Sequence, residues 1–145
     1  VLARADASIM TDMLCGVIQE GTGKKARVIK RPVAGKTGTT DNYKDAWFTG
    51  FTPSLCTSVW TGFDKNKRLK STRGAGITGG VGAAPIWADF MLNAMKGEPE
   101  RAFSVPNNIR FEAVPPSTGC APEPEGPVSS VPLKTGQAIC GEAVQ

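Results

Sequence analysis

The sequence predicts an α+β fold, an antiparallel sheet of at least three strands with helices packed on it, followed by a Pro-rich tail. Two segments with helical apolar spacing, residues 6–20 and 83–95, flank the central part of the chain. Between them lie three strand-like runs joined by short turns, a pattern typical of an antiparallel meander. After residue 100 the long apolar runs end and most of the eleven prolines appear.

Residues 6–20 are predicted to form the first helix because apolar pairs recur every four residues and mark one helical face. Asp6 or Ser8 suits the N-cap position, and Gly21 suits the end. We expect this helix to pack in the core and to carry no catalytic residue. The pairs are Ile9/Met10, Met13/Leu14 and Val17/Ile18.

The first strand is predicted to run from the lead-in at residues 31–35 through Lys36 to Thr39. Pro32 fits the start or the edge of a sheet better than a central position. A polar turn follows at residues 40–45, and then come strands at 46–53 and 55–63.

A Gly-rich stretch precedes the second helix. Five glycines occur in residues 74–82. They predict a loop that either has special backbone geometry or lies very close to another backbone or a ligand. We expect this loop near the candidate site on the first strand. The helix at 83–95 has Pro85 in its first turn and Gly97 just beyond its end.

The composition predicts one domain over residues 1–100 and a tail over 101–145. The segment from Val105 to Val114 is expected to lay one short strand against the body of the domain, and Pro122–Pro127 has the composition of a linker. Because the sequence starts at Val1 without a methionine, we expect a fragment or a processed piece of a longer protein.

The charge and hydropathy of the chain limit its partners. The net charge is +4, and the basic residues gather around 24–31 and 65–73, which we interpret as a solvated basic edge. No nucleic-acid-binding module accompanies these residues, so nucleic acid is not an expected partner. No apolar run reaches the roughly 18 residues of a membrane span, so this segment is not expected to contact a membrane.

The cysteines predict no metal site. Cys120 and Cys140 could form a disulfide that cross-links the tail, whereas Cys15 and Cys56 are expected to be buried free thiols. The chain has no histidine, and the cysteine spacing matches no zinc pattern, so no metal or cofactor is expected.

The candidate site is the tetrapeptide Lys36, Thr37, Gly38, Thr39. It combines a cation, two hydroxyls and a position without Cβ, which suits an anionic acyl substrate. The Thr39 backbone N–H could stabilise a developing oxyanion. The same residues also fit an ordinary strand that ends in a Gly-Thr turn. A phosphate-binding loop is disfavoured because position 30 is Lys where that motif has Gly.

Several stretches around this tetrapeptide match one known pattern in collinear order over residues 8–95. The chain resembles the C-terminal half of the transpeptidase domain of class A penicillin-binding proteins. The stretches are residues 10–14, Gly21-Thr22-Gly23, residues 34–40, residues 45–53, residues 59–64, Thr78-Gly79-Gly80 and residues 83–87. A second Lys-Thr-Gly at residues 134–136 lies outside this pattern and is interpreted as chance.

The resemblance implies a penicillin-binding, serine transpeptidase-like fold and a D,D-transpeptidase that cross-links peptidoglycan stem peptides through an acyl-enzyme. Lys36 would supply positive charge, and Thr37 and Thr39 would hold the substrate carboxylate or acyl group. The Thr39 N–H would be an oxyanion donor, and Gly38 would let the substrate lie against the strand. The expected partners are D-Ala-D-Ala stem peptides, β-lactams and the missing N-terminal half of the domain. The expected location is the periplasmic or extracytoplasmic face of the bacterial inner membrane, to which the parent protein would be anchored.

The chain departs from that family by lacking its nucleophile. The family also uses a Ser-x-x-Lys and a Ser-x-Asn motif, and none of the serines here has Lys three positions on or Asn two positions on. We therefore expect the chain to be inactive alone. A non-catalytic module that senses β-lactams or binds peptidoglycan is the alternative. The serines are Ser8, Ser54, Ser58, Ser71, Ser104, Ser117, Ser129 and Ser130.

Overall fold

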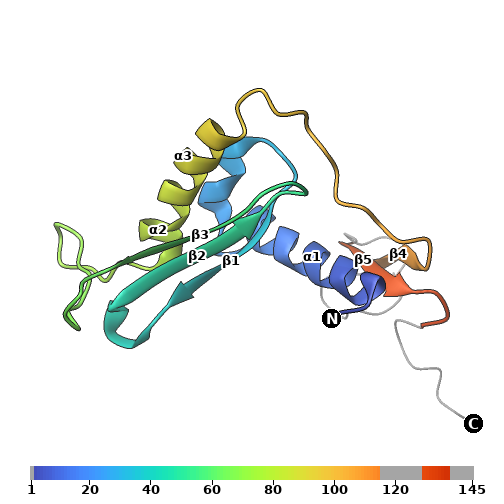
Figure 1. Cartoon of the computed structure of the whole chain (residues 1–145). Helices are drawn as coiled ribbons and strands as arrows, with labels where there is room; N and C mark the ends of the chain where they lie inside the picture. The colour runs from blue at the N-terminus through green and yellow to red at the C-terminus, as the bar shows by residue number, and fades with distance from the viewer. Residues whose placement is uncertain (1, 115–128, 138–145) are drawn as a thin grey trace, which may run out of the picture. The chain divides into compact units, whose positions relative to one another are not determined.

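The computed structural model describes residues 2–114 and 129–137, and its fold is α+β as predicted (Figure 1). The chain divides into two compact units, one formed by Met13–Phe103 and the other by Val1–Asp12 with Ser104–Gln145. The helix α1, Arg4–Gln19, contributes residues to both units.

The larger unit contains the predicted meander. Strands β1 (Ala34–Thr39), β2 (Asp45–Phe51) and β3 (Cys56–Gly62) form an antiparallel sheet in the order β1-β2-β3. The polar turn between β1 and β2 contains one short 3-10 helix, η2 (Asp41–Tyr43).

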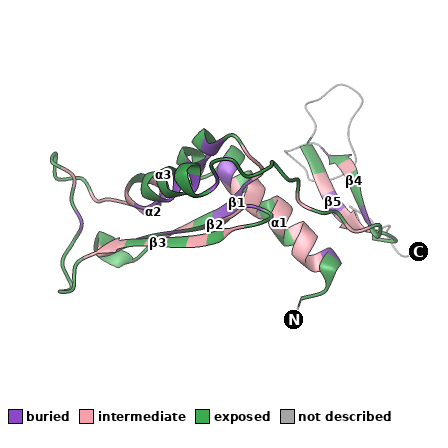
Figure 2. Cartoon of the chain, turned by 45° about the horizontal axis from the view of Figure 1, so that its top comes forward, coloured by how far each residue is buried: buried purple, intermediate pink, exposed green. Residues whose placement is uncertain are grey.

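Helical segments cover one face of this sheet. They are η1 (Lys24–Ile29), α2 (Gly79–Gly82) and α3 (Ala84–Ala94). Buried residues alternate along β2 and gather on one side of α3 (Figure 2). The predicted second helix is therefore confirmed, whereas η1 was not predicted.

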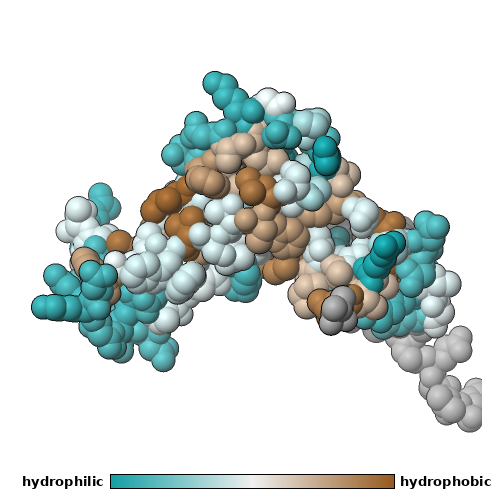
Figure 3. Space-filling model, viewed as in Figure 1, coloured by the Kyte–Doolittle hydropathy of each residue, from teal (hydrophilic) through white to brown (hydrophobic). Residues whose placement is uncertain are grey.

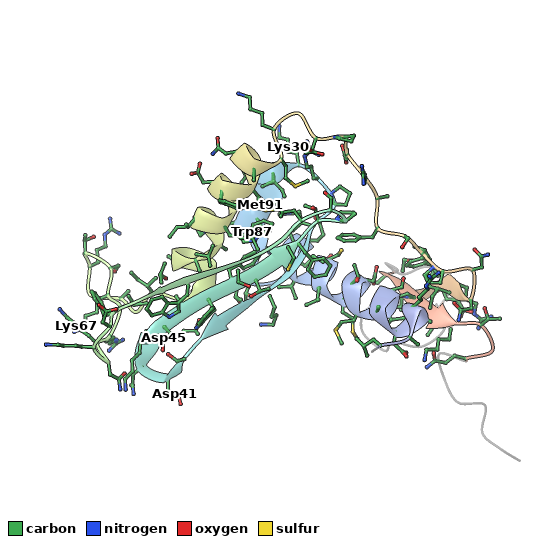
Figure 4. All side chains as sticks on the ribbon, viewed as in Figure 1. Lys30, Asp41, Asp45, Lys67, Trp87 and Met91 are labelled. Atoms are coloured by element: carbon green, nitrogen blue, oxygen red, sulfur yellow. The ribbon has the colours of Figure 1, made fainter. Side chains whose placement is uncertain are left out.

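Trp87 is the centre of the core. It is fully buried, and its ring meets the ring of Phe48 edge-on with centroids 5.1 Å apart. Its indole Nε1 donates a hydrogen bond to the backbone oxygen of Thr57 at 3.0 Å, and Met91 lies one helical turn further along α3 (Figure 4). One side chain thus fixes α3 against both β2 and β3.

Large apolar side chains remain exposed elsewhere in this unit. Trp47 and Trp60 lie on the sheet face opposite the helices and are 44% and 43% exposed. Apolar surface also covers part of α2 and α3 (Figure 3), where Val81, Ile86 and Phe90 are exposed.

The first helix departs from its predicted core role. Ala5 and Ile18 of α1 are buried, but Met10 and Met13 are 50% and 63% exposed. The apolar periodicity therefore predicts the helix correctly but overestimates how much of it is buried. Cys56 is also exposed rather than buried, because it begins β3 on the face away from the helices, and Cys15 in α1 is only half-buried.

The smaller unit contains a two-stranded antiparallel sheet. Strand β4 (Ile109–Val114) pairs with β5 (Ser129–Lys134). The strand expected within 105–114 exists, but its partner is β5 rather than the body of the domain, and β5 was not predicted. Its Lys134 also forms an ion pair with Asp6 at 2.5 Å.

Two expectations lie outside the described residues, the bridge between Cys120 and Cys140 and the linker at Pro122–Pro127. Among the helices that the structure describes, none combines the length and the apolar character that a membrane crossing requires.

Candidate functional site

The peptide groups of Thr37 and Thr39 point to the edge of β1 that faces away from β2. Thr40 donates its backbone N–H to the oxygen of Asp45 at 3.1 Å, which identifies this facing pair as hydrogen-bonded. Because such pairs alternate along an antiparallel ladder, Lys36 also bonds to β2, whereas Thr37 and Thr39 bond outward. In the described sheet, no other strand pairs with that edge.

Lys36 places a cation on this edge. Its side chain is exposed, and Nζ donates a hydrogen bond to the backbone oxygen of Thr37 at 3.0 Å. The ammonium group is therefore held beside the outward peptide groups of the strand, at the end of an exposed side chain.

The side chain of Thr37 lies on the opposite face from Lys36, as strand alternation predicts. Its cross-strand neighbour is Phe48, which is fully buried under the helices. The Thr37 hydroxyl forms a hydrogen bond of 2.7 Å with the hydroxyl of Thr22, in the loop after α1. Either oxygen can be the donor, so the two hydroxyls act as one unit.

The hydroxyl of Thr39 has a backbone partner. The N–H of Gly79, at the start of α2, donates to Thr39 Oγ1 at 3.0 Å. A Cβ at Gly79 would lie 2.1 Å from the oxygen of Trp47 and 2.5 Å from that of Gly38. The Gly-rich segment therefore approaches the strand closely, as predicted, and only glycine fits at this position.

Gly38 has a neighbour across the sheet. A Cβ at this position would lie 3.1 Å from Cβ of Trp47, which is tighter than ordinary van der Waals contact. Because Gly38 has no side chain, there is room for Trp47, and no Cβ projects from the strand at the position next but one to Lys36.

Asp45 lies at the end of the turn after β1 (Figure 4). Its carboxylate accepts hydrogen bonds from two side chains. Thr40 Oγ1 donates to Asp45 Oδ2 at 3.0 Å, and Trp60 Nε1 donates to Asp45 Oδ1 at 2.9 Å. The backbone N–H of Asp45 returns a bond to Thr40 Oγ1 at 2.9 Å. These bonds fix the end of the strand that carries Thr39.

The basic loop after β3 packs on this turn through aromatic rings. The guanidinium of Arg68 lies 5.1 Å from the ring centre of Tyr43, and Nζ of Lys67 lies 5.2 Å from that of Phe63. The backbone N–H of Leu69 donates to the oxygen of Tyr43 at 2.7 Å. The loop therefore has defined contacts, and Lys67 lies at its outer end (Figure 4).

All four predicted site residues lie on β1, where they combine a cation, two hydroxyls and outward backbone amides. Such an edge can bind a carboxylate and can hold an acyl group along the strand. Sequence reasoning assigned no site role to Thr22 or Gly79. Their signal was present, because both lie in short glycine motifs of the collinear pattern.

The chain is similar to curated proteins named penicillin-binding protein 1A. It is 43% identical over 106 residues to the protein from Aquifex aeolicus, which is 73% of this chain and 14% of that relative. It is 43% identical over 122 residues to the protein from Pseudomonas aeruginosa, which is 83% of this chain and again 14% of the relative. No protein-family model matches the chain.

Solved structures give the same result for the fold. The crystal structure of penicillin-binding protein 1A from Haemophilus influenzae matches with a TM-score of 0.77 and 31% identity, over 90% of this chain and 20% of that one. The PonA1 protein from Mycobacterium tuberculosis in complex with penicillin V matches with a TM-score of 0.66 and 33% identity, over 73% of this chain and 30% of that one.

Proposed function

Because this chain is homologous to part of the penicillin-binding proteins 1A, in sequence over most of its length and in fold, we propose that it supplies the substrate-binding strand of a peptidoglycan D,D-transpeptidase. In this proposal residues 1–100 are the C-terminal half of the transpeptidase domain and 101–145 are a C-terminal tail. The observation that carries it is the open edge of β1, where Lys36 lies beside outward-facing peptide groups.

Each residue of β1 has a role in the proposed site. The ammonium of Lys36 stabilises the anionic substrate and the proton-transfer groups of the site. The hydroxyls of Thr37 and Thr39 hold the carboxylate of a D-Ala-D-Ala stem peptide or of a β-lactam. The N–H of Thr39 donates to the oxyanion that forms when a serine attacks the acyl carbonyl. Gly38 lets the substrate lie close to the strand.

The attacking serine must come from outside these 145 residues, because neither Ser-x-x-Lys nor Ser-x-Asn occurs in the sequence. The chain is therefore inactive alone, and its principal partner is the N-terminal half of the same domain. A location on the outer face of the bacterial inner membrane follows, because that is where peptidoglycan is cross-linked. A module that senses β-lactams or binds peptidoglycan without catalysis is the second candidate.

The proposal is tested in the full-length protein that contains this chain. Lys36→Ala should slow acylation by a labelled penicillin by about a hundredfold, because it removes a charge that stabilises the transition state. The measurement is the rate of covalent labelling, with circular dichroism to verify the fold. Lys25→Ala, an exposed lysine in η1, is the matched control and should label at the normal rate.

Two outcomes would contradict the proposal. Normal labelling of Lys36→Ala would show that this lysine does not contribute to acylation. A full-length protein that binds peptidoglycan but forms no acyl-enzyme would favour the non-catalytic module.

A further inference from the structure

We propose that Thr22 and Gly79 are positioning residues that orient the two threonine hydroxyls of β1 toward a substrate carboxylate. The inference rests on the proposed function and adds residues to which neither the motif on β1 nor the comparisons give a role. Thr22 is 15 residues before its partner Thr37, and Gly79 is 40 residues after its partner Thr39.

The first contact is the hydrogen bond between the hydroxyls of Thr22 and Thr37. Thr22 Oγ1 and Thr37 Oγ1 lie 2.7 Å apart, so one O–H donates to the other. Each hydroxyl has a single hydrogen, so the pair uses one and keeps one for an outside acceptor. A hydroxyl that already accepts a bond is a better donor to a third group because hydrogen bonds in a chain polarise one another. In the arrangement in which Thr22 donates, Thr37 accepts this bond and keeps its own hydrogen, as a strengthened donor, for the substrate.

The second contact is the hydrogen bond from the Gly79 N–H, which occupies one lone pair of Thr39 Oγ1. The N–H of Gly79 donates to Thr39 Oγ1 at 3.0 Å, so this oxygen is already an acceptor inside the protein. With one of its two lone pairs occupied in this way, the hydroxyl still has its hydrogen to donate to a ligand. An ionised carboxylate is the strongest available acceptor for such a donor. The contact thus favours a hydrogen-bond acceptor at Thr39, and a carboxylate more than a neutral carbonyl.

Packing links the two contacts into one unit. A Cβ at Gly80 would lie 2.4 Å from the backbone oxygen of Thr22, while a Cβ at Gly79 would strike the backbone of β1 and β2. The Gly79–Gly80 segment therefore touches both the strand and the loop that carries Thr22. A displacement of this segment would disturb both threonines together.

The first test uses Thr22→Val in the full-length protein, with Thr22→Ser as the rescue variant. Val keeps the shape and removes the hydroxyl, and Thr22 is exposed, so the fold should survive. Two acyl donors are compared that differ only in a carboxylate or a carboxamide. We expect kcat/KM for the carboxylate donor to fall about tenfold, the carboxamide donor to change little, and Ser to restore the rate.

The second test uses Gly79→Ala, whose Cβ has no space, against Gly16→Ala on α1, whose Cβ would meet nothing within 4 Å. Gly79→Ala should show the same loss for the carboxylate donor, and Gly16→Ala should show none. Equal losses for both donors with Thr22→Val and with Gly79→Ala would indicate a structural role and overturn the inference.

The Lys36→Ala variant separates this inference from the proposed function. Impaired labelling of Lys36→Ala together with wild-type behaviour of Thr22→Val and Gly79→Ala would reject the positioning role alone. Normal labelling of Lys36→Ala would reject the proposed function as well.

Discussion

At the scale of single residues, the edge strand shows how neighbouring positions acquire different chemistry. Lys36 is exposed and donates to the carbonyl of the next residue, whereas Thr37 and Thr39 each bind a partner from another segment. The difference follows from strand alternation, because the two threonines face the helical layer and Lys36 faces away from it. A tetrapeptide can therefore present an exposed cation and two hydrogen-bonded hydroxyls at once.

Asp12 on α1 gives a prediction for pH dependence. Burial raises the pKa of its carboxyl above the ordinary value. The folded chain thus holds this proton more tightly than the unfolded chain, so the free energy of unfolding should fall as the pH rises through the folded-state pKa. Asp12→Asn should raise the stability at pH 7 by a small amount and remove this part of the pH dependence.

The measurement for Asp12→Asn is urea unfolding at pH 3 and pH 7. Asp64→Asn, in an exposed loop, is the matched control and should change the unfolding free energy by less than about 0.5 kcal/mol. A larger gain for Asp12→Asn at pH 3 than at pH 7 would contradict the assigned sign.

At the scale of elements, local patterns predicted the meander and both long helices because each has its own periodicity. The sequence could not predict β5, because Pro132 breaks its alternation and its register depends on β4. It could not predict the contacts of Thr22 and Gly79 either, since these join segments far apart in the chain. What the sequence missed is therefore mainly the pairing between elements rather than the elements themselves.

Helix α3 allows a test of which of its faces stabilises the unit. Trp87→Ala should lower the free energy of unfolding by about 3–5 kcal/mol, because it removes a fully buried ring and its bond to Thr57. Phe90→Ala on the same helix removes a ring that is 49% exposed and should cost on the order of 1 kcal/mol. The measurement is urea unfolding of both variants.

Equal costs for the two variants would show that the outer side of α3 is covered in solution. In that case the exposed apolar surface over α2 and α3 would be an interface between molecules, and sedimentation would reveal the association.

At the scale of the whole molecule, the chain matches only 14% of the length of the curated relatives from Aquifex aeolicus and Pseudomonas aeruginosa. Strand β1 is built from residues within Met13–Phe103, including both threonine contacts. The proposed binding edge therefore lies wholly within this chain, whereas the proposed nucleophile does not. Binding and catalysis should separate when the chain is studied alone.

The separation predicts the behaviour of the 145-residue chain toward penicillin. Incubation followed by intact-mass spectrometry should show no covalent adduct, because the sequence contains no nucleophile motif, while the full-length protein treated in parallel should gain one penicillin. Cys56 is exposed, so Cys56→Ser is included to exclude acylation of its thiol. A stable adduct that persists in Cys56→Ser and maps to a serine or threonine of this chain would mean that β1 carries its own nucleophile, and the proposed division between the two halves of the domain would be wrong.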